Sequence, residues 1–222
     1  QWSSSAASDV YKRQHNSLIK IPKIVNDLKK GKSIAIVSDA GMPGICDPGE
    51  DISRNVKSEG IDIICVPGAC AAITALVSSG LPSSSFVFEG FLPKKQINRN
   101  KVLFEISTNE KTTIIYESPK RLRKLLMELL EFCGGDREIM VARELTKKFE
   151  EHVGNNINDV IKYFDDKDVL GEITIVVKGI KKRESTPDRF NIKKDLNGLI
   201  NAGLSLSAAS KYLSLIHISE PT

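Results

Sequence analysis

The sequence is poor in the residues that build metal sites and disulfide frameworks. Its 222 residues include only three histidines, and no two of its four cysteines form a C-x-x-C pair. A structural zinc site needs four such ligands at characteristic spacings, so we do not expect one. The cysteines are predicted to be reduced thiols, as in cytosolic proteins. They are Cys46, Cys65, Cys70 and Cys133.

Long apolar runs are also lacking. No run approaches the ~20 residues that a membrane-spanning helix requires, and no signal peptide is visible. Lysine and arginine total 32 and aspartate and glutamate 28, which gives a net charge of +4. Such a mildly basic chain fits a nucleic-acid or phosphate partner without requiring one. A cytoplasmic location is predicted.

Both ends of the chain look foreign to the rest. Residues 9–14 read Asp-Val-Tyr-Lys-Arg-Gln, and residues 213–218 read Leu-Ser-Leu-Ile-His-Ile. One DNA word of the transposase-adapter type encodes the first peptide on one strand and the second on the other. We therefore expect residues 1–14 and 213–222 to be translated sequencing adapter, and we leave them out of the reasoning about the fold.

Between these tails, helical patterns alternate with short apolar runs, which is typical of an α/β fold. We expect an α/β subdomain over residues 15–90, a second over 91–183 with a cleft between the two, and the start of a helical segment over 184–212. Helices are predicted over 19–30, 50–59, 69–79, 94–106, 119–133 and 158–164. Strands are predicted over 33–37, 61–66, 85–88, 112–116, 137–142, 148–153 and 172–177.

The stretch that follows the first predicted strand is the most informative one. Residues 38–49 read Ser-Asp-Ala-Gly-Met-Pro-Gly-Ile-Cys-Asp-Pro-Gly, which can continue neither a helix nor a strand. Loops at the carboxyl ends of strands are where ligands bind in open α/β sheets. An ordinary turn would explain Pro48 and Gly49, but not Asp39 directly after a strand. We interpret the stretch as a ligand loop centred on Ser38, Asp39, Ala40, Gly41 and Met42.

A second loop repeats this design one predicted strand later. In residues 66–72, Pro67 and Gly68 turn the chain, and the small side chains of Cys70 and Ala71 follow at a helix start. Such a start offers free backbone N–H groups to a ligand. Close packing of the helix on the sheet through alanine is the alternative. Two such loops at one edge of a sheet strengthen the ligand interpretation of both.

Two further strand ends carry carboxylates. Glu117 follows the apolar strand over 112–116, and Glu144 follows the strand over 137–142. Each carboxylate could act as a general base, bind a ribose hydroxyl or serve as a charge at a helix end. The residues by themselves leave these alternatives open.

Basic residues gather just after the strand ends of the second half. Charged runs on helices often mark a solvated face, but this position beside the predicted cleft favours an anionic macromolecular substrate. The candidate substrate contacts are Lys94, Lys95, Arg99, Lys120, Arg121, Arg143, Lys147 and Lys148.

These motifs converge on one family. S-D-A-G-M-P-G-I-C-D-P-G, V-P-G-A-C-A-A-I-T-A-L, G-L-P-S-S-S-F-V-F-E-G-F-L-P, Y-E-S-P-K-R-L and A-R-E-L-T-K-K-F-E-E occur in this order. Together they closely resemble the bacterial small-subunit ribosomal RNA (cytidine-2′-O)-methyltransferases of the tetrapyrrole (corrin/porphyrin) methylase superfamily. The resemblance implies S-adenosylmethionine in a cleft between two α/β subdomains, a cytidine 2′-oxygen of 16S ribosomal RNA as methyl acceptor, and a homodimer. A methylase of corrin precursors and a non-catalytic RNA-binding relative are the alternatives.

The resemblance also implies roles for particular residues. The cofactor should contact Asp39 and Met42 of the first loop, Cys70 and Ala71 of the second, and the backbone at Tyr116; Leu145 is a weaker candidate. Glu117 and Glu144 are the candidate general bases within this sequence, an acidic residue of the family's first segment is an equal alternative, and no metal is implied. The family begins with a strand and a glycine- and proline-rich loop that this sequence does not show. The expected activity is therefore that of the parent protein.

Overall fold

In a computed structural model, the described residues are 17–38, 40–46, 49–181, 196–201 and 203–218. The chain divides into two compact units, Gln1–Ile180 and Lys181–Thr222. The tail predicted over 1–14 lies outside the described residues, and the predicted division at residue 90 stays a prediction. The boundary near residue 180 lies close to the one predicted after residue 183.

The first unit begins with two helices, α1 (Ser17–Lys29) and α2 (Glu50–Ser58). They pack on each other through an apolar cluster, and an ion pair joins Lys29 to Glu59 just after α2. Both helices match the predicted ones closely, because their apolar residues recur at helical spacing. The cluster consists of Ile21, Ile24, Ile52 and Val56.

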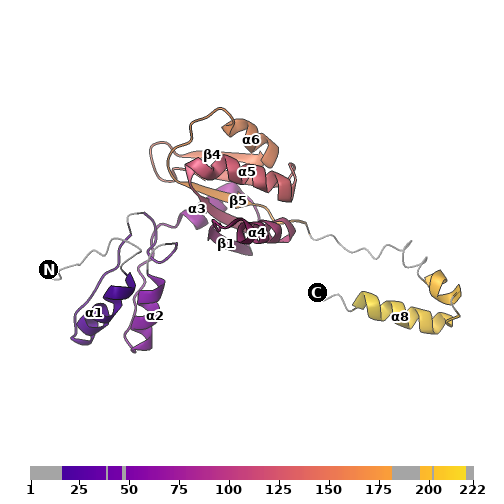
Figure 1. Cartoon of the computed structure of the whole chain (residues 1–222), viewed down its shortest axis with the longest axis horizontal. Helices are drawn as coiled ribbons and strands as arrows, with labels where there is room; N and C mark the ends of the chain where they lie inside the picture. Colours follow the sequence, from indigo (N-terminus) through magenta and orange to yellow (C-terminus); the bar gives the residue numbers. More distant parts are fainter. Residues whose placement is uncertain (1–16, 39, 47–48, 182–195, 202, 219–222) are drawn as a thin grey trace. The chain divides into compact units, whose positions relative to one another are not determined.

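The first unit contains a mixed five-stranded sheet (Figure 1). Its order is β1 (Phe86–Phe91), β2 (Thr112–Glu117), β5 (Ile173–Val177), β3 (Glu138–Arg143) and β4 (Glu151–Asn156). β1 and β2 run parallel, while every other neighbouring pair is antiparallel. A parallel pair needs a crossover connection, and the helix α4 (Gln96–Thr108) provides it.

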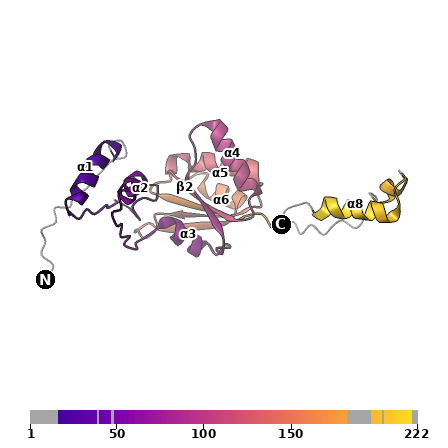
Figure 2. The same cartoon turned by 90° about the horizontal axis from the view of Figure 1, so that it is seen from below.

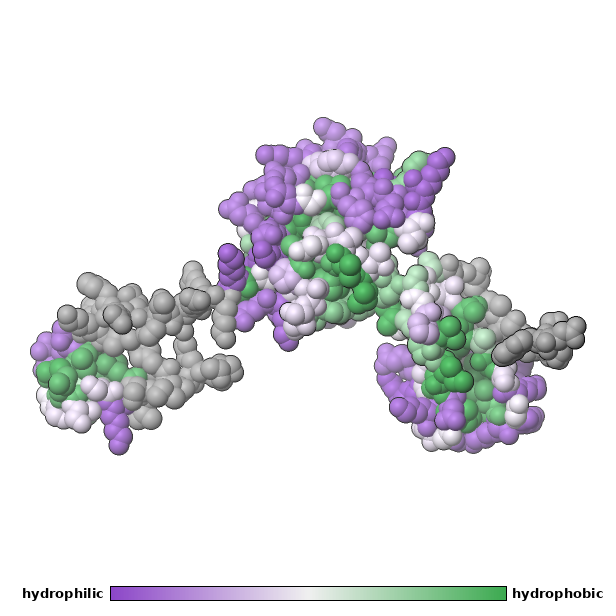
Figure 3. All heavy atoms as spheres, turned by 180° about the vertical axis from the view of Figure 1, so that it is seen from behind, coloured by the Kyte–Doolittle hydropathy of each residue, from purple (hydrophilic) through white to green (hydrophobic). Residues whose placement is uncertain are grey.

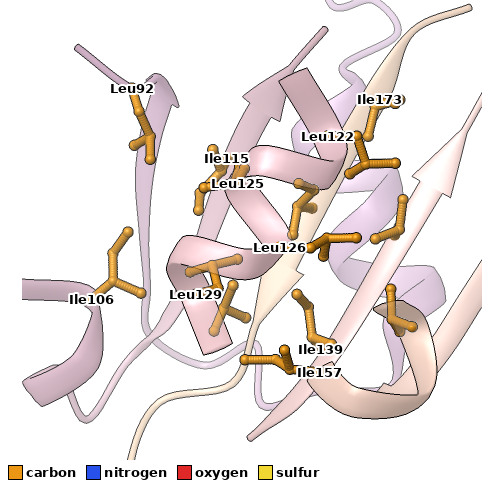
Figure 4. Close-up of a cluster of buried hydrophobic side chains, with 14 of the residues drawn as sticks. Leu92, Ile106, Ile115, Leu122, Leu125, Leu126, Leu129, Ile139, Ile157 and Ile173 are labelled. Atoms are coloured by element: carbon orange, nitrogen blue, oxygen red, sulfur yellow. The ribbon is translucent and has the colours of Figure 1, made fainter. Parts of the chain in front are cut away.

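Helices cover both faces of this sheet. α3 (Ala71–Ser79) packs on one face, and α4, α5 (Pro119–Cys133) and α6 (Ile157–Phe164) pack on the other (Figure 2). Successive side chains of a strand point to opposite faces. In β2, accordingly, Ile114 joins the cluster under α3, whereas Ile115 joins the larger cluster with α4, α5 and α6 (Figure 4).

Most predicted elements of the sheet region are confirmed, and α5 has the predicted bounds. α3 begins two residues later than predicted because Cys70 is still extended, at φ −134° and ψ 110°. β4 begins three residues later than predicted because a turn in which the Glu150 amide bonds the Lys147 carbonyl precedes it.

The strands predicted over 33–37 and 61–66 are wrong. Both segments lack strand structure. Ile34 and Ile61 are half-buried against the α1–α2 cluster, but other β-branched side chains are exposed; Ile64 is 87% exposed and Val66 79%. A strand needs a neighbouring chain that accepts and donates its backbone hydrogen bonds. Each segment runs without such a ladder, so the apolar composition alone did not produce a strand.

The second unit is helical where it is described. Residues 196–201 form a short helix, and α8 (Leu206–Ile218) follows with Ala209 and Leu213 buried. α8 includes part of the tail predicted over 213–222, whose origin stays a prediction. The first residues of the predicted helical segment, 184–195, lie outside the described residues. Among the helices that are described, none combines the length and the apolar character needed to cross a membrane.

Candidate functional site

The first loop, residues 38–46, takes a backbone path that needs glycine. Gly41 and Gly44 have φ angles of 75° and 84°, in the left-handed region that favours glycine. A Cβ atom on Gly41 would lie 3.5 Å from the carbonyl oxygen of Ala69, so the first loop runs beside the second. Asp39, the residue expected to carry the ligand interaction, lies outside the described residues, as do Asp47 and Pro48.

The two predicted loops line one pocket of about 630 Å³. Met42 and Ile45 come from the first loop, and residues 67–70 come from the second. The first turn of α3 and the β1 side chains Phe86 and Phe88 complete the lining. This volume falls in the ~300–1,000 Å³ range of small-molecule sites, and the mostly apolar lining is typical of them.

A close approach at Gly90 holds the first loop against the sheet. Gly90 lies in β1 with a φ of 62°, and a Cβ atom there would be 2.6 Å from the Cys46 sulfur. A side chain there would have to displace the sulfur, so glycine lets the loop come close to β1. Cys46 itself has a left-handed φ of 57°.

Tyr116 connects the second loop to the sheet. Its hydroxyl accepts a hydrogen bond of 3.0 Å from the Ala72 N–H, one of the first amides of α3. Its ring makes edge contacts with Phe88 and Phe91, with ring centroids 5.0 and 5.8 Å apart. Burial, as the main cause, raises the pKa of Tyr116 to about 12, so the hydroxyl keeps its proton at neutral pH.

Three of the residues predicted to bind the cofactor gather at this place. Cys70, Tyr116 and Leu145 all pack against the apolar cluster between α3 and the sheet. They come from the second loop, from the end of β2 and from the turn after β3. Cys70 also lines the pocket, so this cluster and the pocket adjoin.

Glu117 faces away from that cluster, and its role as a general base stays a prediction. Since side chains alternate along β2, Glu117 points to the side of α4 and α5. Its side chain is 1% exposed, and its carboxylate accepts hydrogen bonds from the Ser118 N–H and from Arg121, at 2.8 and 2.7 Å. Arg99 lies 3.5 Å from the second oxygen. A carboxylate so engaged stabilises the turn after β2.

Arg99 is likewise not part of an exposed basic surface. Its side chain is 6% exposed, and its Nε donates to Glu128 of α5 at 2.8 Å. A buried guanidinium needs such carboxylate partners, since an unpaired buried charge is costly. The sequence carried this signal, because Arg99, Leu103 and Ile106 share one face of α4 at helical spacing.

The Glu144 carboxylate is bound inside the turn that follows β3. Its Oε1 accepts hydrogen bonds from Lys147 Nζ at 2.8 Å and from the Glu172 N–H at 2.9 Å. These bonds, that from Lys147 first, lower the pKa of Glu144 and make it a weaker base than an ordinary carboxylate. Lys147 also pairs with the Glu172 carboxylate at 3.0 Å, so this predicted substrate contact already has two partners.

The other basic side chains predicted to contact the substrate differ in whether they are already paired within the protein. Arg143 is bound to Glu151 at 2.9 Å and to the Leu170 carbonyl. Lys148 is exposed beside the Phe149 ring. The starts of α4 and α5 adjoin, since Lys124 Nζ lies 3.4 Å from the side-chain oxygen of Gln96. We call the exposed lysines there the α4–α5 basic patch: Lys94, Lys95, Lys120 and Lys124.

Metal-binding side chains do not gather in the described part of the chain. No group of three or more histidine, cysteine, aspartate or glutamate residues there could hold a metal ion.

Comparison with known proteins assigns this arrangement to a family. Residues 4–161 match the family model of tetrapyrrole (corrin/porphyrin) methylases. The chain is 39% identical over 201 residues to ribosomal RNA small subunit methyltransferase I of Synechocystis, covering 90% of this chain and 72% of that protein. It is 44% identical over 169 residues to the protein of that name from Vibrio cholerae, covering 75% of this chain and 59% of that protein.

Solved structures show the same fold at lower identity. The methyltransferase CobJ superposes with a TM-score of 0.56 and 20% identity, covering 77% of this chain and 74% of that one. The cobalt precorrin-4 methyltransferase CbiF superposes with a TM-score of 0.53 and 16% identity, covering 71% and 69%.

Proposed function

Because the chain belongs to the tetrapyrrole (corrin/porphyrin) methylase family, we propose that its parent protein transfers a methyl group from S-adenosylmethionine to small-subunit ribosomal RNA. The acceptor we propose is the ribose 2′-oxygen of a cytidine. The observation that carries the proposal is the pocket lined by both glycine-bearing loops. The names of the relatives at 39% and 44% identity support the RNA substrate.

The residues of the pocket fit S-adenosylmethionine. Its volume of about 630 Å³ suits a ligand of that size. Met42, Ile45 and Phe88 offer apolar surface for an adenine ring and a methionine chain, and the start of α3 lies in the same lining. A cation gains by lying near an aromatic ring, and Phe86 and Phe88 supply rings in the lining.

The protein's part in the reaction is mainly one of positioning. Bound S-adenosylmethionine supplies a methyl group that is already activated by its positive sulfur. Both loops would hold the donor, and the chain's part would be to hold the acceptor oxygen close to it in the reactive orientation, a positioning effect worth roughly several kcal/mol. A carboxylate that removes the hydroxyl proton would assist, but Glu117 and Glu144 are bound to basic partners.

The α4–α5 basic patch is the surface that we propose for the RNA backbone. Four lysines at the adjoining starts of two helices attract phosphates, and their binding should weaken as salt is added. Work on ribosomal RNA implies the cytoplasm as the place of action. We also propose a homodimer; the apolar atoms visible on the sheet-bearing part of the first unit (Figure 3), with exposed Ile73 and Val77 on α3, support a protein contact.

A transfer assay tests the proposal. The parent protein, with an unbroken reading frame, is incubated with S-adenosylmethionine carrying a labelled methyl group and with small ribosomal subunits that lack the modification. We expect label in the RNA and, at a cytidine, a phosphodiester that resists alkali, because a methylated 2′-oxygen cannot attack its neighbouring phosphate. Label in a corrin precursor but not in RNA would favour the alternative function, methylation of corrin precursors. If the protein binds RNA but isothermal titration with S-adenosylmethionine releases or absorbs no heat, a non-catalytic RNA-binding role would be favoured.

A glycine pair provides the matched variants. Gly68 lines the pocket, and a Cβ atom added there meets no atom within 4 Å, so Gly68→Leu should fill the pocket without straining the fold. Gly198 is equally open but lies in the second unit. We expect Gly68→Leu to abolish cofactor binding and Gly198→Leu to preserve it. Equal binding by both variants would remove the pocket from the proposal.

A further inference from the structure

The turn after β3 breaks the alternation of side chains in an informative way. Met140 and Ala142 of β3 belong to the cluster under α3, so a continued strand would place Glu144 on that side and Leu145 on the other. Leu145 instead packs against the cluster with Met140 and Ala142. On the side of the candidate site, the apolar side chain of Leu145 thus takes the place that the Glu144 carboxylate would have in a continued strand.

The exchange coincides with an uncommon backbone. Glu144 has a φ of 53° and Thr146 a φ of 66°, so residues without the freedom of glycine take the left-handed conformation on both sides of Leu145. This conformation is uncommon for any such residue and an outlier for a β-branched one. It persists only where the surroundings hold it in place.

Those surroundings are visible for both residues. The Glu144 N–H donates to the Glu172 carbonyl at 2.9 Å, while the Glu172 N–H donates back to the Glu144 carboxylate at 2.9 Å. Lys147 adds its 2.8 Å bond to the same carboxylate oxygen. The Thr146 N–H donates to Glu150 Oε2 at 2.7 Å. We call the bonds among Glu144, Lys147 and Glu172 the Glu144 clamp.

Gly171 supplies the space for this clamp. A Cβ atom on Gly171 would lie 2.4 Å from the Cγ, Cδ and Oε1 atoms of Glu144. Any side chain there would therefore displace the carboxylate from its bonds. Gly171 also has a left-handed φ of 96°, which glycine adopts at little cost.

We propose that Glu144 is a positioning residue: its clamp, with Gly171 beneath it, turns Leu145 toward the cluster that holds Cys70 and Tyr116 and so shapes the cofactor site. This inference rests on the proposed function. It assigns Glu144 a role other than proton transfer, because its carboxylate already accepts hydrogen bonds from Lys147 and from the Glu172 amide.

The test compares replacements that keep or remove the clamp. The side-chain oxygen of Glu144→Gln still accepts the two bonds, whereas Glu144→Ala and Gly171→Ala lose them. We expect the Kd for S-adenosylmethionine to rise about tenfold or more in the last two variants, the loss of roughly one good contact. The Kd and the kcat of Glu144→Gln should stay within about threefold of the values for the unsubstituted chain.

Gly134 provides the matched control. It ends α5 with a φ of 79°, and a Cβ atom there meets nothing within 4 Å. Gly134→Ala therefore carries a comparable backbone strain without touching Glu144, and its Kd should equal that of the parent chain. In the Glu144→Ala background, Gly171→Ala should raise the Kd little further, since the displaced group is already absent.

Each result decides between the two roles. An equal and large loss of kcat in Glu144→Gln and Glu144→Ala, with unchanged Kd, would identify a general base and overturn the inference. So would a Glu144→Ala variant that matches the parent chain in both constants.

A structural readout separates this inference from the proposed function. Nuclear Overhauser contacts from the Leu145 methyl groups to Met140 or Ala142 should be present in the parent chain and lost in Glu144→Ala, without any ligand. If neither this chain nor the parent protein binds S-adenosylmethionine, the proposed function fails while these contacts still test the clamp. If the contacts survive in Glu144→Ala, the clamp fails whatever the pocket binds.

Discussion

Two apolar segments of the first unit have similar compositions and opposite fates. Ile173–Val177 is β5, paired with β2 on one side and β3 on the other, and Ile175 is 0% exposed. Residues 61–66 contain four β-branched side chains against five in Ile173–Val177, yet Ile64 is 87% exposed and no strand forms. The difference teaches that an apolar run becomes a buried strand only where neighbouring strands complete its hydrogen bonds.

Charged groups show the same contrast. In the sheet region Arg99, Glu117 and Glu128 form a buried ion cluster between α4, α5 and the end of β2. In the α1–α2 region, Lys29 and Glu59 pair at the surface, where water competes for both. Removal of a partner should therefore cost much in one region and little in the other.

The largest expected difference in unfolding free energy comes from replacing one isoleucine of each segment by alanine. Ile175→Ala empties a fully packed position and should lower the free energy of unfolding by roughly 4 kcal/mol, within the usual 2–5. Ile64→Ala should change it by less than about 0.5 kcal/mol. Urea unfolding followed by circular dichroism measures both. A comparable loss for Ile64→Ala would mean that residues 61–66 are buried in solution, and the contrast between the two regions would collapse.

The charged pairs sharpen the contrast next. Glu128→Ala leaves Arg99 buried with only the longer contact to Glu117, and should cost about 3 kcal/mol of unfolding free energy. Glu59→Ala removes the surface partner of Lys29 and should cost less than about 1 kcal/mol. The same unfolding measurement applies. Equal costs would show that Arg99 reaches water in solution.

A double-mutant cycle probes where the first loop meets the sheet. Gly90→Ala places a methyl group against the Cys46 sulfur and forces a left-handed alanine, and should cost about 1–2 kcal/mol. Cys46→Ala removes the sulfur, so the double variant should recover at least about 0.5 kcal/mol of that cost. Strict additivity in thermal unfolding would place the loop away from β1.

The smallest effect is one in which the two regions should agree. Hydrogen bonds from Lys147 to Glu144 and from Lys32 to Asp27 lower the pKa of each carboxyl group below its ordinary value. A lowered folded-state pKa stabilises the fold above the unfolded pKa, and this contribution is lost as the pH falls through the folded pKa. Carboxyl carbon NMR titration should show each midpoint returning upward in Lys147→Met or Lys32→Met, and no movement would discount the corresponding bond.

Local pattern predicted much of the fold. Pro119 after Ser118 marked the start of α5, and apolar residues at helical spacing marked α2 and α6, because capping and amphipathic periodicity act within a few residues. The five sheet strands were also predicted, with shifted ends, since each has partners for its backbone. The strands over 33–37 and 61–66 failed because pairing depends on residues far away in the sequence.

Predictions for the site divided along the same line. The loops around Met42 and Cys70 were predicted from their glycine and proline residues, and they line one pocket. The side to which a side chain points was not available from spacing alone. Glu117 and Arg99 therefore turned out to lie in the buried ion cluster, and Glu144 in a clamp.

The sequence by itself determined the helices, the family and the positions of the tight loops, because capping residues, periodicity and glycine conformations are properties of neighbouring residues. Only the tertiary structure decided which apolar runs became strands, which face of the sheet each carboxylate occupies and that Leu145, rather than Glu144, packs against the cluster under α3. The physical reason is that backbone pairing, charge burial and a left-handed turn are each fixed by partners brought together from distant parts of the chain.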